Sequence, residues 1–367
     1  MKRILVTGAG GAPATNFVRS LRDAPEQYHI IGIDSNKYYL QRAETDEKHL
    51  LPRSSDDEYL PVLKELIEET SAELIFAQPD PEIVVISRHR TELPTRTYLP
   101  DDETVQLCQD KYASYLRWQE AGLPVPTTLA IHGPEDLKVA FQELGTPVWL
   151  RPVTGAAGRG SLCSGDLEQA ETWIDFNKGW GNYTAAEYLS PRSVTWQSLW
   201  KDGELVVAQG RLRLYWEFAD RAPSGVTGIT GAGVTVSDEQ VDRIALDAIL
   251  AVDSRPHGIF SVDLTYGKDG TPNLTEINIG RFFTTHYFFT AAGLNMPYIC
   301  VKLAFGESPP PIPRVINPLN PGLVWIRGMD AHPVLTTVDQ LELCEQELET
   351  RRAKSATHAG QTVSLVP

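Results

Sequence analysis

A predicted β-hairpin between Ser261 and Arg281 constrains this chain more than any other stretch. The segment Ser-Val-Asp-Leu-Thr-Tyr precedes a Gly-Lys-Asp-Gly turn at residues 267–270, and the segment Leu-Thr-Glu-Ile-Asn-Ile follows the turn. Two short strands joined by a glycine-bounded turn are a strong signal for a hairpin. Any fold proposed for this chain must therefore contain that hairpin.

Oxygen-bearing side chains gather on the predicted hairpin. Asp263 lies on the first strand, and Glu276 and Asn278 lie two positions apart on the second. Alternate residues of a strand point to one face, so Glu276 and Asn278 share a face that Asp263 reaches from across the hairpin. Two carboxylates and an amide, with no histidine or cysteine nearby, suit Mg²⁺, or Mn²⁺ in its place, that carries nucleotide phosphates. The alternative is a solvated hairpin with polar residues on its open face.

The composition limits the partners to expect. The chain has 367 residues, and its 33 lysines and arginines against 48 aspartates and glutamates give a formal charge of −15. Because phosphate contacts need a basic surface, this excess argues against nucleic acid or an anionic membrane as a partner. No apolar run is long enough to cross a bilayer, the N-terminus does not resemble a signal peptide, and the four cysteines form no C-x-x-C pair. We expect a cytoplasmic protein that binds small molecules, with a homodimer left open.

A βαβ unit with a glycine-rich first turn is predicted at the N-terminus. The apolar run Ile4–Thr7 ends in Gly-Ala-Gly-Gly-Ala-Pro, a helical pattern follows, and a second apolar strand, His29–Ile33, ends at Asp34. Such a turn places backbone N–H groups near a helix N-terminus, where an anion is stabilised. The spacing leaves an NAD(P)-dependent oxidoreductase or epimerase of the short-chain type as the alternative function. The Tyr-x-x-x-Lys pair that such an enzyme needs occurs at 298–302, too late in the chain for that role.

A helix over Asp57–Thr70 and a strand over Glu73–Ala77 are predicted to continue this unit. Asp80 and Glu82 follow the strand, and polar residues after a parallel strand line the usual ligand crevice of an open α/β sheet. The two acids either face a substrate or, more commonly, stabilise the N-terminus of the next helix.

A second glycine-rich run lies in the middle of the chain, with Arg151 before it and Arg159 within it. Asp-Lys111 opens a helix, and a strand ends at Arg151 before the run Thr-Gly-Ala-Ala-Gly-Arg-Gly-Ser at residues 154–161. Glycines let backbone amides approach phosphates closely, so this run fits a phosphate-covering loop. A mobile hairpin is the alternative.

Three strands are predicted next, over Thr184–Leu189, Val194–Lys201 and Glu204–Leu214. The last of these holds Arg211 and Arg213 on one face, where they either bind an anionic group of a substrate or lie at the surface.

The later part of the chain is predicted to hold mainly helices. An amphipathic helix spans Asp238–Val252, and one apolar helix, interrupted at Gly293, spans His286–Phe305. A strand pair is expected around Leu323–Thr337, and a polar, frayed end is expected from about Glu345.

The order of these features resembles the ATP-grasp superfamily, most closely its carbamoyl-phosphate synthetase and biotin carboxylase branch. The resemblance rests on the Gly-rich first turn, Asp-Lys at 110–111, Arg-Pro at 151–152, the second glycine-rich run, Glu-Tyr-Leu at 187–189, and the set Asp263 and Glu-Ile-Asn-x-x-Arg at 276–281. It covers about residues 1–306 as a single ATP-grasp module, and the combination is far more specific than any one motif.

The resemblance implies an α/β and α+β architecture. It predicts a Rossmann-like pre-ATP-grasp domain over residues 1–100 and an ATP-grasp domain over residues 101–308. The latter would contain a small lid subdomain at about 125–190 and a larger antiparallel-sheet subdomain. A short C-terminal extension with a flexible end would occupy residues 309–367.

The resemblance also implies a role for each matching position. Asp263, Glu276 and Asn278 would bind Mg²⁺, with Asp263 standing where the family has a Gln or Glu. Arg281 would stabilise an acyl-phosphate, and Arg211 is predicted to assist catalysis by holding an anionic group. The predicted ATP-binding residues are Lys111, Arg151, Gly155, Gly158, Arg159, Gly160, Glu187, Tyr188 and Leu189.

The implied activity is that of an ATP-dependent ligase. A carboxylate is a poor electrophile, because its leaving group would be oxide, and phosphorylation by ATP-Mg²⁺ converts it to an acyl-phosphate that an amine or thiol of a small molecule attacks. Fixed cations and Mg²⁺ would neutralise the phosphate as it moves, and ADP and phosphate would be released.

Overall fold

The structure is a computed structural model that describes residues 1–156, 158–328 and 334–363, with side chains described up to residue 357. The chain forms two compact units. Unit 1 comprises Met1–Leu99, Gly280–Pro311 and Met329–Pro367, and unit 2 comprises Pro100–Ile279 and Ile312–Gly328. The boundary at Ile279 and Gly280 falls at the end of the predicted hairpin.

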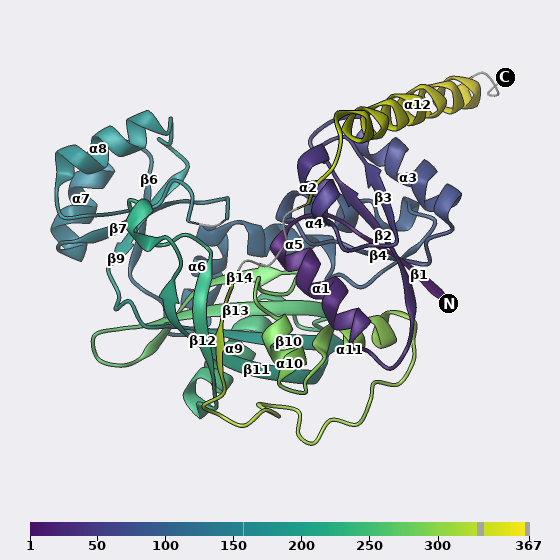
Figure 1. Cartoon of the computed structure of the whole chain (residues 1–367). Coiled ribbons are helices and arrows are strands. Elements are labelled where there is room, and N and C mark those ends of the chain that lie inside the picture. The colour runs from purple at the N-terminus through teal and green to yellow at the C-terminus, as the bar shows by residue number, and fades with distance from the viewer. Residues whose placement is uncertain (157, 329–333, 364–367) are drawn as a thin grey trace. The chain divides into compact units, whose positions relative to one another are not determined.

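Unit 1 is built on a parallel sheet with strand order β3-β2-β1-β4-β5 (Figure 1). The near-continuous apolar composition of its central strands is typical of parallel strands that are covered on both faces, and residues such as Ile4, Leu5 and Ile30 are fully buried. Its strands are β1 (Lys2–Val6), β2 (Tyr28–Asp34), β3 (Glu47–Leu50), β4 (Leu74–Phe76) and β5 (Arg96–Thr97), and its connecting helices are α1 (Ala12–Arg22), α2 (Lys37–Arg42), α3 (Tyr59–Thr70) and α4 (Asp80–Arg88).

Two helices replace the single apolar helix predicted over His286–Phe305. The helices are α10 (Tyr287–Ala291) and α11 (Met296–Ala304). The chain breaks between them because Gly293 adopts a φ of +104°, and the side chain of Asn295 then accepts a hydrogen bond from the backbone N–H of Tyr298 to cap α11. The predicted interruption at Gly293 is therefore confirmed, and it divides the stretch into two separate helices.

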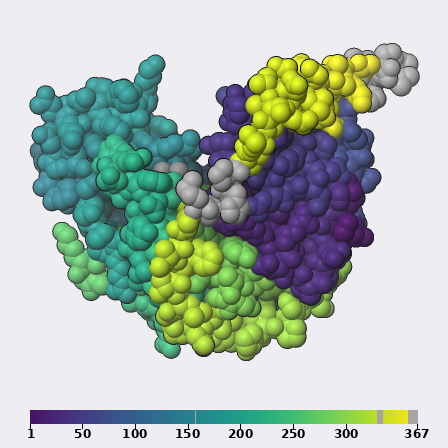
Figure 2. All heavy atoms as spheres, in the orientation of Figure 1, coloured from purple at the N-terminus to yellow at the C-terminus, as the bar shows by residue number. Residues whose placement is uncertain are grey.

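The predicted frayed end is instead a long helix, α12 (Val338–Val363). Glutamate, glutamine, leucine and arginine dominate this stretch, and all of them favour helix. The side chains of Leu341, Cys344, Leu348 and Arg351 recur at helical spacing and are the less exposed ones, because α12 contacts α3 and β3. Figure 2 shows α12, in yellow, lying over the purple N-terminal residues of the same unit.

Unit 2 is built on a six-stranded sheet with order β14-β13-β10-β11-β12-β15, in which all neighbours pair antiparallel. One face is apolar and contacts α9 (Glu239–Val252), to which Trp196 also donates a hydrogen bond at Asp242. The other face is polar and is described below. The strands are β10 (Ser193–Lys201), β11 (Glu204–Trp216), β12 (Thr230–Val236), β13 (Gly258–Tyr266), β14 (Pro272–Ile279) and β15 (Val324–Ile326), and α5 (Asp102–Gln109) and α6 (Lys111–Glu120) contact β14.

The strand pair predicted around Leu323–Thr337 is not formed within the described residues. The strand β15 pairs with β12 instead, through partners such as Val324 and Val234. Residues 334–337 carry no strand, and residues 329–333 lie outside the described part of the chain. A long-range pairing with β12 thus replaces the local hairpin.

A separate four-stranded sheet with order β6-β9-β7-β8 forms the smaller part of unit 2. Helices α7 and α8 cover it, and its core includes the fully buried Val148, Leu150 and Ala185. The elements are β6 (Thr128–Ile131), α7 (Pro134–Leu144), β7 (Val148–Pro152), β8 (Leu162–Ser164), α8 (Leu167–Phe176) and β9 (Tyr183–Glu187).

Across the described residues, no helix combines the length and the apolar character that a membrane span requires.

The glycine-rich first turn tolerates no side chain at Gly10. A Cβ built there would lie 1.8 Å from the backbone oxygen of Tyr39, so the backbone would have to move. We expect Gly10→Ala to destabilise the protein by about 1–3 kcal/mol, the usual cost of overpacking a tight site. Urea denaturation followed by circular dichroism measures the change. Gly165→Ala is the matched control because nothing lies within 4 Å of its Cβ position; equal losses in the two variants would contradict the packing argument.

Candidate functional site

The predicted hairpin is formed by β13 and β14, and its register brings the predicted metal ligands together. Asp263 is the direct cross-strand partner of Glu276, and Ser261 is the partner of Asn278. A register shift follows Asp263, where the extra residue Thr275 donates its hydroxyl hydrogen to the backbone oxygen of Asp263 at 2.9 Å. The hairpin interpretation is confirmed, and the three oxygen-bearing side chains occupy one face.

A row of polar side chains continues from the hairpin across the sheet. Thr195 of β10 is the cross-strand partner of both Asp263 and Arg211, so one row of registered residues runs from β11 to β14. The hydroxyl of Thr195 donates to Asp263 Oδ1 at 2.5 Å and accepts from Arg211 Nη2 at 2.9 Å. Asn278 Nδ2 donates to the second oxygen, Asp263 Oδ2, at 3.0 Å. The structure therefore joins Arg211 to the hairpin through Thr195.

Arg211 and Arg213 carry two guanidinium groups into this face. Arg211 is 1% exposed, and it and Arg213 both donate to the hydroxyl of Thr230, at 3.0 and 3.1 Å. Burial lowers the pKa of Arg211 to about 9, the charge of Arg213 adds to that shift, and Asp263 opposes it. Arg213 also lies over the ring of Trp216, 3.6 Å from its centroid. Neither arginine is a plain surface residue.

Burial also affects the carboxylate in the row. It raises the pKa of Asp263, and the Glu276 carboxylate adds to the shift, whereas Arg213, Thr195 and Arg211 oppose it. The electrostatic balance of Asp263 is thus set chiefly by its position between strands and by the two arginines.

Lys111 links the hairpin to the second glycine-rich run. It is the first residue of α6, whose N-cap Asp110 accepts hydrogen bonds from the N–H groups of Tyr112 and Ala113. Its ammonium group lies 3.8 Å from Glu276 Oε2 and donates to the backbone oxygen of Gly155 at 2.5 Å. The ammonium group of Lys111 therefore contacts two other predicted site residues, Glu276 and Gly155, which come from separate parts of the chain.

Arg151 is the penultimate residue of β7 and reaches the same hairpin. Its Nη2 donates to the backbone oxygen of Thr275 at 2.9 Å, and its Nε has no hydrogen-bond partner among the described residues. Burial lowers the pKa of Arg151, and the charge of Glu276 opposes the shift. A half-buried guanidinium with an unused donor is suited to an anion.

The second glycine-rich run has one anchored end and one exposed end. The backbone oxygen of Gly160 accepts hydrogen bonds from Trp173 Nε1 at 2.8 Å and from the Tyr183 hydroxyl at 2.9 Å. Gly155 and Arg159 are exposed, and Ala157 lies outside the described residues. Gly158 has a φ of +66°, and a Cβ there would lie 2.5 Å from the backbone oxygen of Val226. Glycine is required at this position both for conformation and for space.

The predicted adenine-reading segment lies at the end of β9. Glu187 is the last residue of that strand, and its Oε1 accepts from the backbone N–H of Thr127 at 3.1 Å. Tyr188 and Leu189 follow without regular structure and are partly exposed. The roles of these three residues stay predictions.

Arg281 belongs to unit 1 and is paired within it. Its Nε lies 2.5 Å from Asp80 Oδ1, and its Nη2 donates to Asp80 Oδ2 at 3.1 Å. Asp80 thus pairs with the cation that was predicted to stabilise an acyl-phosphate, a relation that the sequence spacing of about two hundred residues did not reveal.

The first glycine-rich turn already uses several of its amides. The N–H of Ala9 donates to the oxygen of Ile33, that of Gly10 donates to Asp34 Oδ2, and that of Gly11 donates to the oxygen of Gly8. Pro13 has no N–H to offer. A pyrophosphate would need such amides, so this geometry weighs against the nicotinamide alternative.

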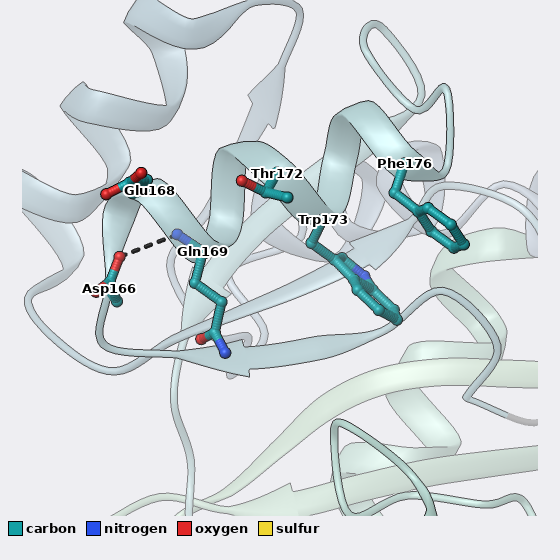
Figure 3. Close-up of a pocket in the computed structure, with 6 residues that line it drawn as sticks. All are labelled: Asp166, Glu168, Gln169, Thr172, Trp173 and Phe176. Atoms are coloured by element: carbon teal, nitrogen blue, oxygen red, sulfur yellow. Dashed lines mark hydrogen bonds between the residues drawn. The ribbon is translucent and has the colours of Figure 1, made fainter.

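A surface groove of about 520 Å³ lies along α8 (Figure 3). The residues lining it come from α8 and its N-cap, and the Asp166 carboxylate accepts from the backbone N–H of Gln169 in an ordinary capping bond. None of the predicted site residues lines the groove. It is an apolar helix surface around Trp173 and Phe176, not a site of convergent polar groups.

The hairpin residues fit a divalent cation that prefers oxygen. Glu276 is about a third exposed, and Glu276 and Asn278 lie two residues apart on one face. No group of three or more histidine, cysteine, aspartate or glutamate residues with metal-binding geometry occurs in the described part of the chain. A cation here would therefore need further oxygens from a nucleotide or from water, which is how Mg²⁺ is commonly held.

Thr230 and Ser193 are polar residues of this face that the sequence analysis missed. Each is a hydroxyl residue in a strand with ordinary composition, and each lies at an alternating position that could have marked a shared face. Their partners are on other strands, so only the register identifies them.

Comparisons with known proteins place this geometry in a known fold. No protein-family model matches the chain. Among solved structures, the biotin carboxylase domain dimer of the 2-oxoglutarate carboxylase from Hydrogenobacter thermophilus, in complex with MgADP, ADP and bicarbonate, has a TM-score of 0.66 at 18% identity, over 88% of this chain and 73% of that chain.

Two further solved structures are similar. The N5-carboxyaminoimidazole synthetase of Staphylococcus aureus with ADP has a TM-score of 0.63 at 15% identity, over 84% of this chain and 78% of that chain. The L-amino acid ligase of Bacillus licheniformis has a TM-score of 0.63 at 15% identity, over 83% of this chain and 74% of that chain.

These proteins share the ATP-grasp fold, and the present chain has that fold. The predicted fold class, a Rossmann-like domain followed by an ATP-grasp fold, is confirmed. Because the identities are low, the likeness shows the fold alone, and the domain limits and the site residues given above stay predictions.

Glu82 offers a test of the acids that follow β4. It is buried, Tyr59 donates to its Oε1 at 3.1 Å, and burial raises its pKa from 4.5 to about 7 against the hydrogen bonds from Thr7 and Tyr59. The native state therefore holds a proton that the unfolded state releases between these values, so the contribution of Glu82 to stability falls as the pH rises from 4.5 to about 7 and is constant above.

We expect Glu82→Gln, which imitates the neutral acid, to gain stability relative to the natural protein across that window by about 3 kcal/mol, from 1.36 kcal/mol for each pKa unit. Urea denaturation of both proteins at several pH values measures the difference. Parallel stability curves would show that Glu82 is ionised when folded.

Proposed function

We propose that the protein is an ATP-dependent ligase that activates a small-molecule carboxylate as an acyl-phosphate and joins it to an amine or another nucleophile, with release of ADP and phosphate. The observation that carries the proposal is the meeting of Glu276, Lys111 and the glycine-rich run on the β13–β14 hairpin. The carboxylate lies 3.8 Å from the ammonium group, which also bonds to the oxygen of Gly155. The ATP-grasp fold and the ligase names of similar structures support the same reading.

The local charge supports an anionic ligand despite the acidic chain. Lys111, Arg151, Arg211 and Arg213 supply four positive charges around two carboxylates, Asp263 and Glu276. A local excess of positive charge attracts phosphates even when the net charge of the protein is −15. We propose ATP and Mg²⁺, or Mn²⁺ in its place, as the cofactors, which similar structures contain as MgADP or ADP.

Each group has a proposed role. The oxygen-rich set of Asp263, Glu276 and Asn278 forms the metal side of the site, and a bound Mg²⁺ supplies charge neutralisation for the transferred phosphoryl group. Lys111 and Arg151 bind phosphates, beneath a lid formed by Gly155, Gly158, Arg159 and Gly160. Glu187, Tyr188 and Leu189 contact the adenine.

The proposed catalytic cations differ in their present partners. Arg281 stabilises the acyl-phosphate in this proposal, and it exchanges Asp80 for that anion. Arg211 acts from within the sheet, through Thr195, while the more exposed Arg213 offers positive charge to an anionic group of the substrate. No covalent nucleophile of the protein is required. We also propose that the ligase acts in the cytoplasm.

Replacing Glu276 tests the proposal directly. We expect Glu276→Ala to abolish ADP release in a screen of carboxylic acids and amines with ATP and Mg²⁺, because the metal loses its charged ligand. Coupled detection of ADP measures the rate. Glu204→Ala is the matched control, since Glu204 is an exposed glutamate at the start of β11. A natural protein that releases no ADP with any acid, or a Glu276→Ala variant with full activity, would reject the assignment.

Lys111 gives a second test that requires no knowledge of the substrate. We expect Lys111→Met to weaken ATP binding by roughly 10- to 100-fold, the range for losing a hydrogen bond between charged groups. Isothermal titration calorimetry with ATP and Mg²⁺ measures the affinity. Lys268→Met, in the exposed turn of the hairpin, is the control, and equal affinities in all three proteins would exclude a phosphate contact at Lys111.

A further inference from the structure

We propose that α12 is a pH-sensitive cover for the outer edge of the parallel sheet in unit 1. It is docked while His49 is neutral and is released when the imidazole of His49 takes up a proton. The contact that carries this proposal is made by Arg351 of α12, which donates to His49 of β3 and to Glu69 of α3. Such a device lies beyond the proposed ligase activity and does not depend on it.

The edge that α12 covers is formed by β3, the outermost strand of the sheet on that side, next to β2. Right-handed crossovers put α2, between β2 and β3, and α3, between β3 and β4, on opposite faces of the sheet. Helix α12 contacts α2, α3 and β3 together, so it lies along the edge itself (Figure 1). An open strand edge is a template for pairing with another chain, and a helix laid over it prevents such pairing.

Polar contacts contribute much of what holds α12 on this edge. Within residues 338–357, where the side chains of α12 are described, Leu348 and Arg351 are the two buried ones. On the α2 side, Glu345 lies 2.7 Å from Lys37 Nζ, but the carboxylate is exposed and such pairs contribute little. The buried contact of Arg351 therefore decides how firmly α12 docks.

The hydrogen bonds around His49 fix its tautomer in the docked state. A guanidinium group has only donors, so His49 Nδ1 must accept from Arg351 Nη2, at 3.3 Å. The ring hydrogen of the neutral imidazole is then on Nε2, which lies 3.3 Å from Glu47 Oε2 and donates to it. The same guanidinium group donates to both carboxylate oxygens of Glu69. The docked arrangement therefore requires a neutral His49.

Protonation of His49 removes the acceptor that Arg351 uses. The added hydrogen goes to Nδ1, because Nε2 already carries one, and it then faces a guanidinium group that offers only hydrogens. Two positive charges meet across 3.3 Å, and their repulsion drives Arg351 away. After release, the Glu47 carboxylate still lies beside His49 and stabilises the imidazolium. Proton uptake and release of α12 are therefore coupled.

Charged groups from several elements surround His49. Two of them act through Glu47, because His29 Nε2 and Arg3 Nη2 each lie 2.6 Å from Glu47 Oε1. Lys48 lies on the other face of β3, where its Nζ donates to the backbone oxygen of Gln41 at 2.8 Å. The whole set is Glu47 of β3, His29 of β2, Arg3 of β1, Glu69 of α3, and Arg351 and Lys354 of α12.

The balance of these groups agrees with the geometry. In the docked state the pKa of His49 is lowered, chiefly by burial and then by Arg351, whereas Glu47 and Glu69 oppose the shift. The docked chain thus binds fewer protons here than the released chain, in which the pKa of His49 returns toward its ordinary value of 6.5. Docking is therefore favoured above pH 6.5 and weakens as the pH falls through that value.

The reactivity of Cys344 tests the proposal on the full chain. Its thiol lies against α2, where Gln41 Nε2 donates to Sγ at 3.4 Å, so release of α12 exposes it. Labelling by N-ethylmaleimide is followed for each cysteine by mass spectrometry between pH 5.5 and 7.5, where ordinary carboxyl groups stay ionised. Each rate is divided by the rate in His49→Asn at the same pH. Asparagine keeps an acceptor for Arg351 but does not titrate, so the ratio cancels the intrinsic pH dependence of the thiol.

We expect the ratio for Cys344 to be near one at pH 7.5 and to rise by roughly five- to tenfold at pH 5.5. One linked proton changes the docking equilibrium by at most about tenfold for each pH unit. A ratio that stays constant would overturn the proposal. His29→Asn removes the other histidine that binds Glu47 and should keep the rise; loss of the rise in that variant would assign the pH response to His29 instead.

Two neighbouring arginines give a matched pair of variants. Arg351→Met should raise the labelling of Cys344 at every pH and abolish its rise at low pH, because His49 then faces no guanidinium group. Arg352→Met removes an ion pair with Glu58, 2.7 Å long and without a histidine, so it should keep the rise. A pH response that survives in Arg351→Met, or that disappears in both variants, would overturn the proposal. Arg351→Met also serves as the reference if His49→Asn fails to fold.

Discussion

The burial of Arg211 within a β-sheet is the constraint on which the rest of the site depends. A guanidinium group that is 1% exposed must find acceptors and a balancing charge, because an unpaired buried cation is strongly unfavourable. Thr195 and Thr230 supply acceptors, and Asp263, one strand further, supplies the charge. The position of Asp263 is thereby fixed by the interior of the sheet. Because Asp263 lies on β13, this also fixes the register of the β13–β14 hairpin against β10.

This arrangement explains how a strongly acidic chain can present the triphosphate site that we propose. The positive charges near the hairpin come from different elements: Lys111 from the start of α6, Arg151 from the end of β7, and the arginines from β11. Each of these elements has only one more basic residue than acidic residues, and the acidic composition of the whole chain conceals this local excess. The fold concentrates cations that the sequence disperses, and the glycine-rich run after β7 adds the exposed Arg159.

Local signals in the sequence correctly predicted the structural features that depend only on neighbouring residues. The glycine turn of the hairpin, the aspartate cap of α6 and the glycines of residues 154–161 act within a few positions, and their elements formed as expected. The register between β10 and its neighbours could not be predicted, because any of several alignments buries the same apolar face. Arg211 was therefore identified as a cation of interest without its Thr195 partner. The helix α12 was missed because its stripe of less exposed residues is covered only when α12 packs against α3, which lies far away in the sequence.

The pairing of Arg281 with Asp80 shows how unit 1 holds the cation that we propose for catalysis. A guanidinium group that donates to both oxygens of one carboxylate is neutralised and fixed in orientation. Its burial is therefore less unfavourable than the burial of an isolated charge. An incoming acyl-phosphate carries more negative charge than a carboxylate and could compete for the same donors. The exchange would leave Asp80 without its cation at the N-terminus of α4, where the helix dipole and the backbone N–H groups stabilise a carboxylate. Asp80 would then be both an acid in the first turn of its helix and a temporary partner of the arginine that we propose for catalysis, which joins the two alternatives that the sequence left open for Asp80.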